Sequence, residues 1–349
     1  DSCFVASISL LGNILIQKFN DTTGRGLMRQ AVRDAGNLTD RERYSILAFY
    51  AENIERDYNR AIANMEILKK MYPDDPVVRN NLGWYHQQNG QYGLALPEYK
   101  QAVRLNPHMT LTYSGILWIY GEYIGNADSA YVWAERMIKD NPDNAWGYFY
   151  MGSAWLFRDS TEKSIQCYQK AMELSPGLMI NRYRLAHTFM NTGKYDEAIK
   201  VLEKILISNP EEYSAYYNLG CCHEALGDQQ AARAWFLKFR ESTEELWLKN
   251  YPDHYATYTS LASVAARLGE MELSRQLLNK AVELDSTQYF SFAEVLCVQD
   301  NIPEALDYIE LALEHGFRNL YNLKANPDLS VLRFDIRLQN LLDKYFMPE

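Results

Sequence analysis

Apolar and polar positions alternate along the chain with the period of amphipathic helices, and residues 146–176 show this pattern most completely. A polar break at Asp159-Ser160 separates two apolar stripes, and Pro176, which has no amide donor, ends the second. Because a single helical hairpin cannot bury its own apolar faces, the pattern predicts hairpins that stack on one another. The apolar and small residues at helical spacing are Tyr148, Met151, Gly152, Trp155, Ile165, Tyr168, Ala171 and Met172.

The same hairpin recurs along the chain with a period of 34 or 35 residues. Steps of 34 from Gly152 reach Trp118, Ala186 and Gly220, and Gly83 lies 35 before Trp118. A period of this length indicates a repeat architecture. The prolines that close the second helices, with spacings of 34, 35, 34 and 34, are Pro73, Pro107, Pro142, Pro176 and Pro210. The alanines that open the second helices are Ala61, Ala95, Ala130, Ala198 and Ala232.

These positions resemble the tetratricopeptide repeat, whose pattern is Trp-x2-Leu-Gly-x2-Tyr, then Ala-x3-Phe, then Pro. Asn-Leu-Gly occurs at 81–83 and again at 218–220, and Ala-x-x-Leu-x-Pro occurs at 102–107 and at 171–176. The resemblance implies an all-α, right-handed superhelical solenoid of antiparallel helix pairs. In this family the first helix of each pair lines the inner groove.

The spacing predicts a solenoid of about eight to nine hairpins over residues 1–316 and a set of capping helices at 317–349, because the last repeat of a solenoid otherwise exposes an apolar face. In residues 1–36, Leu11-Gly12, Met28 and Ala31 fall at repeat positions, and the chain begins with Asp rather than Met, so we expect it to be part of a longer protein. Thr39 and Asp40 are N-cap candidates, and 241–250 is expected to extend a second helix. The expected later repeats are 42–75, 76–110, 111–144, 145–178, 179–212, 213–254, 255–285 and a degenerate one at 286–316.

The tail carries the phrase Asn326-Pro327-Asp328-Leu329, followed by Leu332, Asp335, Arg337, Leu341 and Leu342. This phrase is similar to the ends of repeat arrays attached to bacterial serine/threonine protein kinases, adenylate cyclases and winged-helix regulators. The stretch from Leu38 to Tyr44 is similar to an early part of those arrays. The resemblance implies a sensory or scaffolding part of a bacterial signalling protein.

The composition of the chain limits the classes of partner that it could bind. The net charge of −10 disfavours a nucleic-acid partner, because a phosphate backbone would be repelled over most of the surface. No apolar run approaches the roughly 20 residues of a membrane helix, so we expect a soluble chain with no membrane insertion. The five cysteines are scattered without a C-x-x-C pair, which argues against a disulfide framework and leaves the compartment, cytoplasmic or periplasmic, open. Self-association through the terminal repeats also stays open.

No catalytic, nucleotide-binding or metal-binding motif occurs in the sequence, and the glycines sit at repeat positions instead. Cys221, Cys222 and His223 form the one dense cluster of soft ligands, but adjacent helical residues point about 100° apart, so packing explains them better than a metal. The pairs Glu211-Glu212 and Glu244-Glu245 lie on polar stretches typical of solvated surface. We predict no enzymatic activity, no cofactor and no metal.

The candidate binding site is the inner groove, at the positions that contact ligands in the family. A groove that leaves large rings open favours a protein or peptide partner, since each ring gains on the order of 2 kcal/mol when buried. The alternative is a purely structural role, in which some of these rings pack between neighbouring repeats. Carried over residue by residue, the groove positions are Asn80, Trp84, Gln87, Gln88, Ile119, Tyr123, Trp146, Phe149, Phe157, Tyr183, His187, Asn191 and Tyr217, with Glu122, Glu224 and Arg267 beside them.

Two specialised grooves of the family are not matched. The basic clamp for chaperone tails lacks its lysines and arginines around Asn81 and Asn218, and an asparagine ladder would need more than these two asparagines. The prediction is therefore a non-catalytic protein-interaction scaffold. The alternative is a receptor whose groove closes on a small molecule or peptide, and an enclosed pocket rather than an open groove would distinguish it. Replacing Trp84 and Phe149 with alanine is expected to abolish partner capture and leave helicity unchanged.

Overall fold

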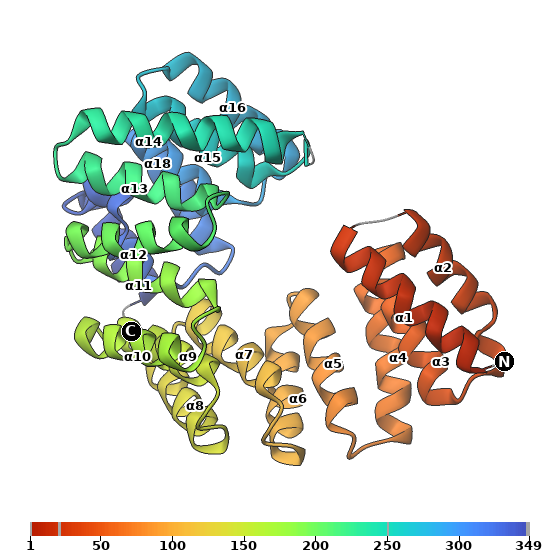
Figure 1. Ribbon diagram of the computed structural model, residues 1–349. Coiled ribbons are helices and arrows are strands. Elements are labelled where there is room, and N and C mark those ends of the chain that lie inside the picture. The colour runs from red at the N-terminus through yellow and green to blue at the C-terminus, as the bar shows by residue number, and fades with distance from the viewer. Residues whose placement is uncertain (1, 20–21, 250, 347–349) are drawn as a thin grey trace. The chain divides into compact units, whose positions relative to one another are not determined.

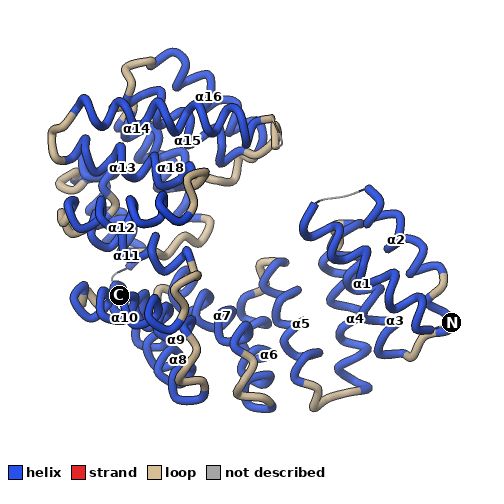
Figure 2. Tube along the Cα trace, viewed as in Figure 1, coloured by secondary structure: helices blue, strands red, loops and turns tan. Residues whose placement is uncertain are grey.

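The computed structural model describes residues 2–19, 22–249 and 251–346, and every regular element in these ranges is a helix (Figures 1 and 2). Within each unit, consecutive helices pair and neighbouring pairs pack together, as α5 does with α6 and with α4 in the first part of the chain and α13 does with α14 and with α12 in the later part. The predicted all-α solenoid of helix pairs is therefore confirmed. The chain divides into two compact units, one made of Asp1–Ile119 and Lys139–Pro142, the other of Tyr120–Ile138 and Asp143–Glu349.

Unit 1 is built from the first hairpins. Its apolar cores lie between α1, α2 and α3 and between α3, α4 and α5. Its helices are α1 (Ser2–Phe19), α2 (Thr22–Arg33), η1 (Ala35–Asn37), α3 (Asp40–Tyr50), η2 (Ala51–Glu55), α4 (Tyr58–Met71), α5 (Pro76–Gln88), α6 (Tyr92–Leu105) and α7 (Thr110–Trp118).

Unit 2 contains the later hairpins and the C-terminal helices. The helices from the unit boundary onward are η3 (Ile119–Ile124), α8 (Ala127–Asp140), α9 (Ala145–Phe157), α10 (Thr161–Leu174), α11 (Met179–Asn191), α12 (Tyr195–Ser208), α13 (Tyr213–Ala225), α14 (Gln229–Ser242), η4 (Thr243–Leu248), α15 (Tyr255–Arg267), α16 (Met271–Leu284), α17 (Tyr289–Val298), α18 (Ile302–Glu314), α19 (Leu320–Ala325), η5 (Pro327–Leu332) and α20 (Ile336–Phe346).

The helix ends follow the predicted signals. Thr39 caps α3 in a capping box with Glu42, which satisfies amide donors at the start of the helix. Each of the five repeat prolines lies two residues beyond the end of a second helix, for example Pro176 after Leu174. These residues set the hairpin boundaries close to where the repeat period places them.

Small residues let the two helices of a hairpin approach closely, and Gly152 is one of them. A Cβ added to Gly152 would lie 2.7 Å from the Tyr168 ring on the partner helix, so even alanine would force a shift. Trp118, which the 34-residue count aligns with Gly152, instead is 40% exposed and packs beside the Tyr92 ring. Further close approaches of this kind include Gly12 to Met28, Gly83 to Tyr99 and Gly220 to Phe236.

Three hairpin helices end in a π-helical turn, which the repeat pattern does not predict. These turns are η2, η3 and η4, and each follows directly on an α-helix. The expected extension at 241–250 is present, because α14 runs to Ser242 and η4 continues to Leu248; Asn250 lies outside the described residues.

The tail after α18 forms α19, η5 and α20, as far as residue 346; residues 347–349 lie outside the described part of the chain. Leu323, Leu329 and Leu332 are at most 2% exposed and pack in one apolar cluster with Phe292 and Ile309 of α17 and α18. The tail is therefore anchored in an apolar core that it shares with α15 to α18. A domain boundary at residue 316 and a capping role stay predictions.

Candidate binding pocket

Unit 2 contains a pocket of about 560 Å³ on the face formed by the first helices of its hairpins. One wall comes from α9, α11, α13, α15 and α17 together with Glu122 of η3, and the other comes from the chain's own tail. We call residues 319–328 of that tail the wall segment. The second helices of the hairpins contribute no residue to this lining.

Leucine burial and amide hydrogen bonds hold the wall segment in place. Asn319 donates to Glu122 Oε2 at 2.8 Å, and Asn326 donates to Glu294 Oε1 at 2.6 Å. The Asn326 side chain also accepts from the amide of Asp328 at 2.9 Å, which caps the start of η5. The wall segment is thus hydrogen-bonded to η3 and to α17, the first and the last of the elements that line the opposite wall.

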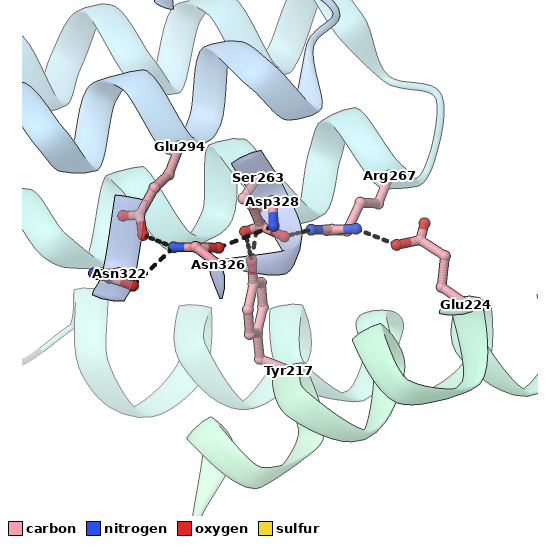
Figure 3. Close-up of polar contacts among 8 residues, drawn as sticks. All are labelled: Tyr217, Glu224, Ser263, Arg267, Glu294, Asn322, Asn326 and Asp328. Atoms are coloured by element: carbon pink, nitrogen blue, oxygen red, sulfur yellow. Dashed lines mark hydrogen bonds and ion pairs between the residues drawn. The ribbon is translucent and has the colours of Figure 1, made fainter. Parts of the chain in front are cut away.

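Arg267 of α15 lies between two carboxylates, as Figure 3 shows. It binds Asp328 Oδ1 of the wall segment at 2.5 Å and pairs with Glu224 of α13 through its other terminal nitrogen. Its side chain is only 9% exposed. Tyr217 completes the group, since its hydroxyl lies 2.9 Å from Ser263 Oγ and 3.4 Å from Asp328 Oδ2. Burial raises the pKa of this hydroxyl well above its ordinary value, so Tyr217 is neutral.

The helix α11 presents Arg184, His187 and Asn191 to the pocket, because residues three and four apart share one helical face. Arg184 has no ion pair or side-chain hydrogen bond within the described residues; its guanidinium lies 5.9 Å from the Phe149 ring. His187 is exposed toward the pocket, and desolvation by the surrounding pocket wall together with the neighbouring Arg184 charge lowers its pKa to about 4, so this imidazole is neutral at pH 7.

Glu294 of α17 also has a shifted pKa. Burial and the nearby charge of Asp328 raise its pKa to about 8, although the hydrogen bond from Asn326 opposes the shift. At neutral pH most molecules therefore carry a protonated Glu294. The pocket thus holds one unpaired guanidinium on α11 and a carboxyl-rich group on α17 and η5.

The structure brings five of the predicted groove residues together in this pocket: Phe157, Tyr183, His187, Asn191 and Tyr217. The remaining predicted residues of unit 2 lie elsewhere. Phe149 is 5% exposed and belongs to the apolar core, and Trp146 packs against it with ring centroids 5.3 Å apart. Tyr123 is 39% exposed and lies beside Gly316.

Unit 1 holds the other predicted residues. Trp84 is 43% exposed and donates to Glu52 at 3.0 Å, and Gln88 is exposed. Asn80 accepts from Thr112, and Gln87 accepts from Tyr99. Ile119 is fully buried and so has no surface to offer a partner.

Sequence reasoning missed Arg184, Glu294 and the amides of the wall segment. Arg184 lies one residue from the predicted Tyr183, and Glu294 stands where the degenerate repeat obscures the register. The wall segment has a recognisable signal in Asn326-Pro327-Asp328, but nothing in those residues predicts that they lie along the first helices.

The soft-ligand cluster shows no metal geometry. Cys222 is buried in the core, and His223 lies 3.6 Å from Asp228. Burial raises the pKa of the Cys221 and Cys222 thiols to about 12, which leaves both protonated and unreactive. Within the described ranges, no three His, Cys, Asp or Glu side chains gather as metal ligands, and no helix is long and apolar enough to cross a membrane.

The stacked hairpins place the chain among the helical repeat proteins. One family model described as tetratricopeptide repeat matches residues 55–110 and 183–245. Another model with the same description matches residues 255–288. Residues 55–110, 183–245 and 255–288 are thus tetratricopeptide repeats, as the sequence pattern indicates. The fold of this family is generally a non-catalytic scaffold for protein–protein interaction.

Relatives with curated names share the repeats over part of their length. The tetratricopeptide repeat-containing protein trd-1 of Caenorhabditis elegans is 26% identical over 175 residues, 49% of this chain and 20% of that protein. The CTR9 homolog of Arabidopsis thaliana is 19% identical over 294 residues, 73% of this chain and 27% of that protein. The chain therefore spans about a fifth to a quarter of the length of these relatives.

Solved structures share the fold. A tetratricopeptide repeat protein from Parabacteroides merdae superposes with a TM-score of 0.57 and 16% identity, over 75% of this chain and 99% of that one. Yeast Tom70 gives a TM-score of 0.57 and 15% identity, over 97% of this chain and 82% of that one. At these identities the likeness concerns the fold alone.

Proposed function

We propose that the chain is a protein-interaction scaffold whose second unit binds a short, polar peptide segment in the pocket between its first helices and its wall segment. The repeats themselves support the scaffold. The finer proposal depends on one observation: the tail encloses the inner face of unit 2 and leaves a pocket of about 560 Å³.

The volume and lining favour a short ligand over a long one. Binding pockets for small ligands are about 300–1,000 Å³, whereas a docked helix or a long strand needs a continuous open groove. The lining is rich in amides and hydroxyls, including Asn191, Asn322, Ser260 and Ser291. Such groups select a ligand by hydrogen bonds to its backbone and polar ends.

A second candidate is a receptor for a small free ligand, and the pocket, which the wall segment covers in part, favours it. The scaffold hypothesis requires binding of a segment that belongs to a larger protein. The two hypotheses differ in whether a peptide attached to a carrier protein binds as well as a free peptide.

Filling the pocket tests the proposal. Ser260 lines it on α15, so Ser260→Trp introduces a large side chain where a ligand would lie. Ser330→Trp is the matched control, because Ser330 is exposed and does not line the pocket. Random decapeptides attached to a carrier protein are selected for binding to the unaltered chain and then measured on both variants by calorimetry.

We expect selected peptides to lose at least about tenfold in affinity on Ser260→Trp and to keep it on Ser330→Trp. Circular dichroism and melting temperature check that both variants are folded. Peptides that bind both variants equally would exclude the pocket, and loss on Trp84→Ala would instead place binding on unit 1.

The wider context is proposed on sequence resemblance alone. A place in a bacterial signalling protein, the absence of a nucleic-acid partner, and self-association through terminal repeats are predictions of this kind. Size-exclusion chromatography with light scattering tests the last one directly.

A further inference from the structure

We propose that unit 1 carries a binding site of its own, in which the Trp84 ring of α5 and the Glu52 carboxylate of η2 take the cationic side chain of a lysine or arginine in a partner protein. The site goes beyond the proposed pocket, since neither residue lines that pocket. The inference rests on the repeats as an interaction scaffold, and it does not depend on what unit 2 binds.

Trp84 offers an exposed ring whose orientation is fixed. Its side chain is 43% exposed, and its indole Nε1 donates to Glu52 Oε1 at 3.0 Å. The bond joins two consecutive first helices, because Glu52 lies in the π-helical turn that continues α3 and Trp84 lies in α5. An indole N–H points along the plane of its ring, so the carboxylate lies at the ring edge. A cation over the ring would therefore lie beside the carboxylate.

The Glu52 carboxylate carries a charge that the fold leaves unbalanced. Its neighbour Glu55, by contrast, pairs with Arg60 at 2.6 Å. Within the part of the chain that the structure describes, Glu52 has no ion pair, although Arg56 follows it by four residues. The donor that binds it, Trp84, is neutral, and a carboxylate has about four acceptor positions on its two oxygens. A basic side chain can thus bind Glu52 without displacing the indole.

Tyr85 does not supply the missing charge either. Burial and the nearby charge of Glu52 raise the pKa of the Tyr85 hydroxyl well above its ordinary value. This hydroxyl therefore stays protonated and neutral. The carboxylate is flanked by an indole and a phenol, and neither balances its charge.

An exposed tryptophan ring beside a carboxylate matches the chemistry of a basic side chain. The negative face of the ring attracts a cation, and the carboxylate accepts hydrogen bonds from its N–H groups. The apolar stem of a lysine or arginine can pack along the ring at the same time. The net charge of −10 also attracts a basic segment at longer range, whereas an acidic segment would be repelled.

The test uses decapeptides with one fixed lysine or arginine and random residues elsewhere, attached to a carrier protein and selected for binding to the unaltered chain. Each selected peptide is then remade with acetyl-lysine or citrulline at the fixed position, because these side chains keep the length and lose the charge. Calorimetry compares the two forms. We expect the charged form to bind about three- to tenfold tighter, and the two series show whether lysine or arginine is preferred.

Glu52→Gln assigns this preference to the carboxylate. The variant keeps an acceptor for the indole and removes the charge, so charged and neutral peptides should bind it alike. Glu55→Gln, three residues further on, is the matched control, because the Glu55 carboxylate is already paired with Arg60. The control should keep the whole preference. Circular dichroism and melting temperature check that both variants are folded.

Trp84→Ala assigns the preference to the ring and should lower the affinity for the charged peptides about three- to fivefold. Trp118→Ala is its control, because Trp118 is similarly exposed at 40% and has no hydrogen bond to a carboxylate within the described residues. The indole N–H signal of Trp84 in nuclear magnetic resonance, assigned by its loss in Trp84→Phe, should shift when a charged peptide is added.

Equal affinity for charged and neutral peptides would overturn the inference, and so would a preference that Glu52→Gln leaves intact or a failure to select any peptide. If the selected peptides lose affinity on Ser260→Trp and not on Glu52→Gln, they occupy the pocket of unit 2, so the inference fails and the proposed function stands. If the preference follows Glu52 while Ser260→Trp weakens no peptide, the inference stands and the pocket proposal fails.

Discussion

The first helices of units 1 and 2 share one repeat pattern, yet their surfaces are in different surroundings. On α5 of unit 1, Trp84 is 43% exposed and Gln88 is exposed, and the Trp84 indole donates to Glu52 of η2 in the same unit. On α13 of unit 2, Tyr217 is covered and hydrogen-bonded to Asp328, more than a hundred residues further along the chain. Cys221 of α13, which follows Gly220 as Trp84 follows Gly83, also lines the pocket, so an equivalent position can be open surface in one unit and the wall of a pocket in the other.

The difference lies in the wall segment. In unit 2 the tail supplies the amides and the carboxylate that the first helices bind, and its leucines anchor it in the apolar cluster with α17 and α18. Repeat position therefore determines which way a side chain points. It does not determine whether that side chain remains available to a partner.

The largest contrast is expected between Phe149→Ala and Trp84→Ala. Phe149 is 5% exposed in the core of unit 2, so its truncation should lower the free energy of unfolding by about 3–5 kcal/mol. Trp84 is half exposed and its truncation should cost less than about 1 kcal/mol. Urea denaturation followed by circular dichroism measures both, and similar losses would erase the contrast.

This expectation corrects the sequence-based view that both substitutions leave the fold unchanged. A loss of partner capture by the pair would therefore be ambiguous. Trp84→Ala alone, with its fold preserved, reports on binding by unit 1.

Truncation of the tail anchor should have the next largest effect. Leu332, four residues after the wall segment, is fully buried in the apolar cluster with α17 and α18, so Leu332→Ala should lower stability by about 2–4 kcal/mol. Val331→Ala is the control, because Val331 is 52% exposed and should change stability by less than about 0.5 kcal/mol. If Leu332→Ala lowers the free energy of unfolding no more than Val331→Ala does, the buried leucine does not fix the wall segment in place.

Arg267→Gln should cost about 2–3 kcal/mol. Without the guanidinium, Asp328 and Glu224 remain partly buried with no cation between them, which is the costly way to break an ion pair. Arg275→Gln serves as the surface comparison, since Arg275 is 68% exposed and 3.9 Å from Glu272. Chemical denaturation of the two variants at one pH should separate them clearly; equal values would mean that the Arg267 cluster contributes no more than a surface pair.

A smaller, pH-dependent effect is expected from Glu294. Its pKa is raised to about 8 in the fold, so the folded state holds a proton that the unfolded chain releases near pH 4.5. The protonated Glu294 therefore makes its whole contribution to the free energy of unfolding below pH 4.5, and this contribution is lost as pH rises through 8. Glu294→Gln should remove this slope and gain about 1–2 kcal/mol relative to the unaltered chain at pH 8, after allowance for partial exposure.

Titration of His187 changes the free energy of unfolding with pH in the opposite direction, so its effect must be measured separately. Its pKa is lowered to about 4, so stability is present above pH 6.5 and is lost as pH falls toward 4. Between pH 6.5 and 8 only the Glu294 slope remains, and denaturation in that window isolates it. An unchanged slope after Glu294→Gln would show that the carboxyl ionises normally.

Much of the fold could be predicted from the sequence because hairpin packing is local. The close approach of Gly152 to Tyr168 and the ends set by Pro176 and Thr39 depend on residues within one hairpin or its neighbour. The π-helical turns η2, η3 and η4 were not predicted, since a single extra residue in a turn leaves no distinct pattern in the sequence.

The site could be predicted only in part. The repeat register places Tyr217 and His187 on the first-helix face, but the contact of Asn319 with Glu122 joins residues far apart in the sequence. Such a contact depends on where a non-repetitive tail comes to rest, and no period in the sequence encodes it. Phe149 shows the same limit, because family register alone does not separate a groove ring from a core ring.

The central claim, that the tail closes the inner face of unit 2, can be tested by cross-linking in solution. Glu122→Cys and Asn319→Cys place thiols where the two side chains are hydrogen-bonded at 2.8 Å, and a short thiol-specific cross-linker should join them within one chain in most molecules. Asn319→Cys combined with Glu203→Cys on the exposed side of α12 is the matched control, and peptide mapping separates the products from those of the native cysteines. Efficient cross-linking of the first pair alone is the predicted result, and equal or absent cross-linking of both pairs would contradict the account.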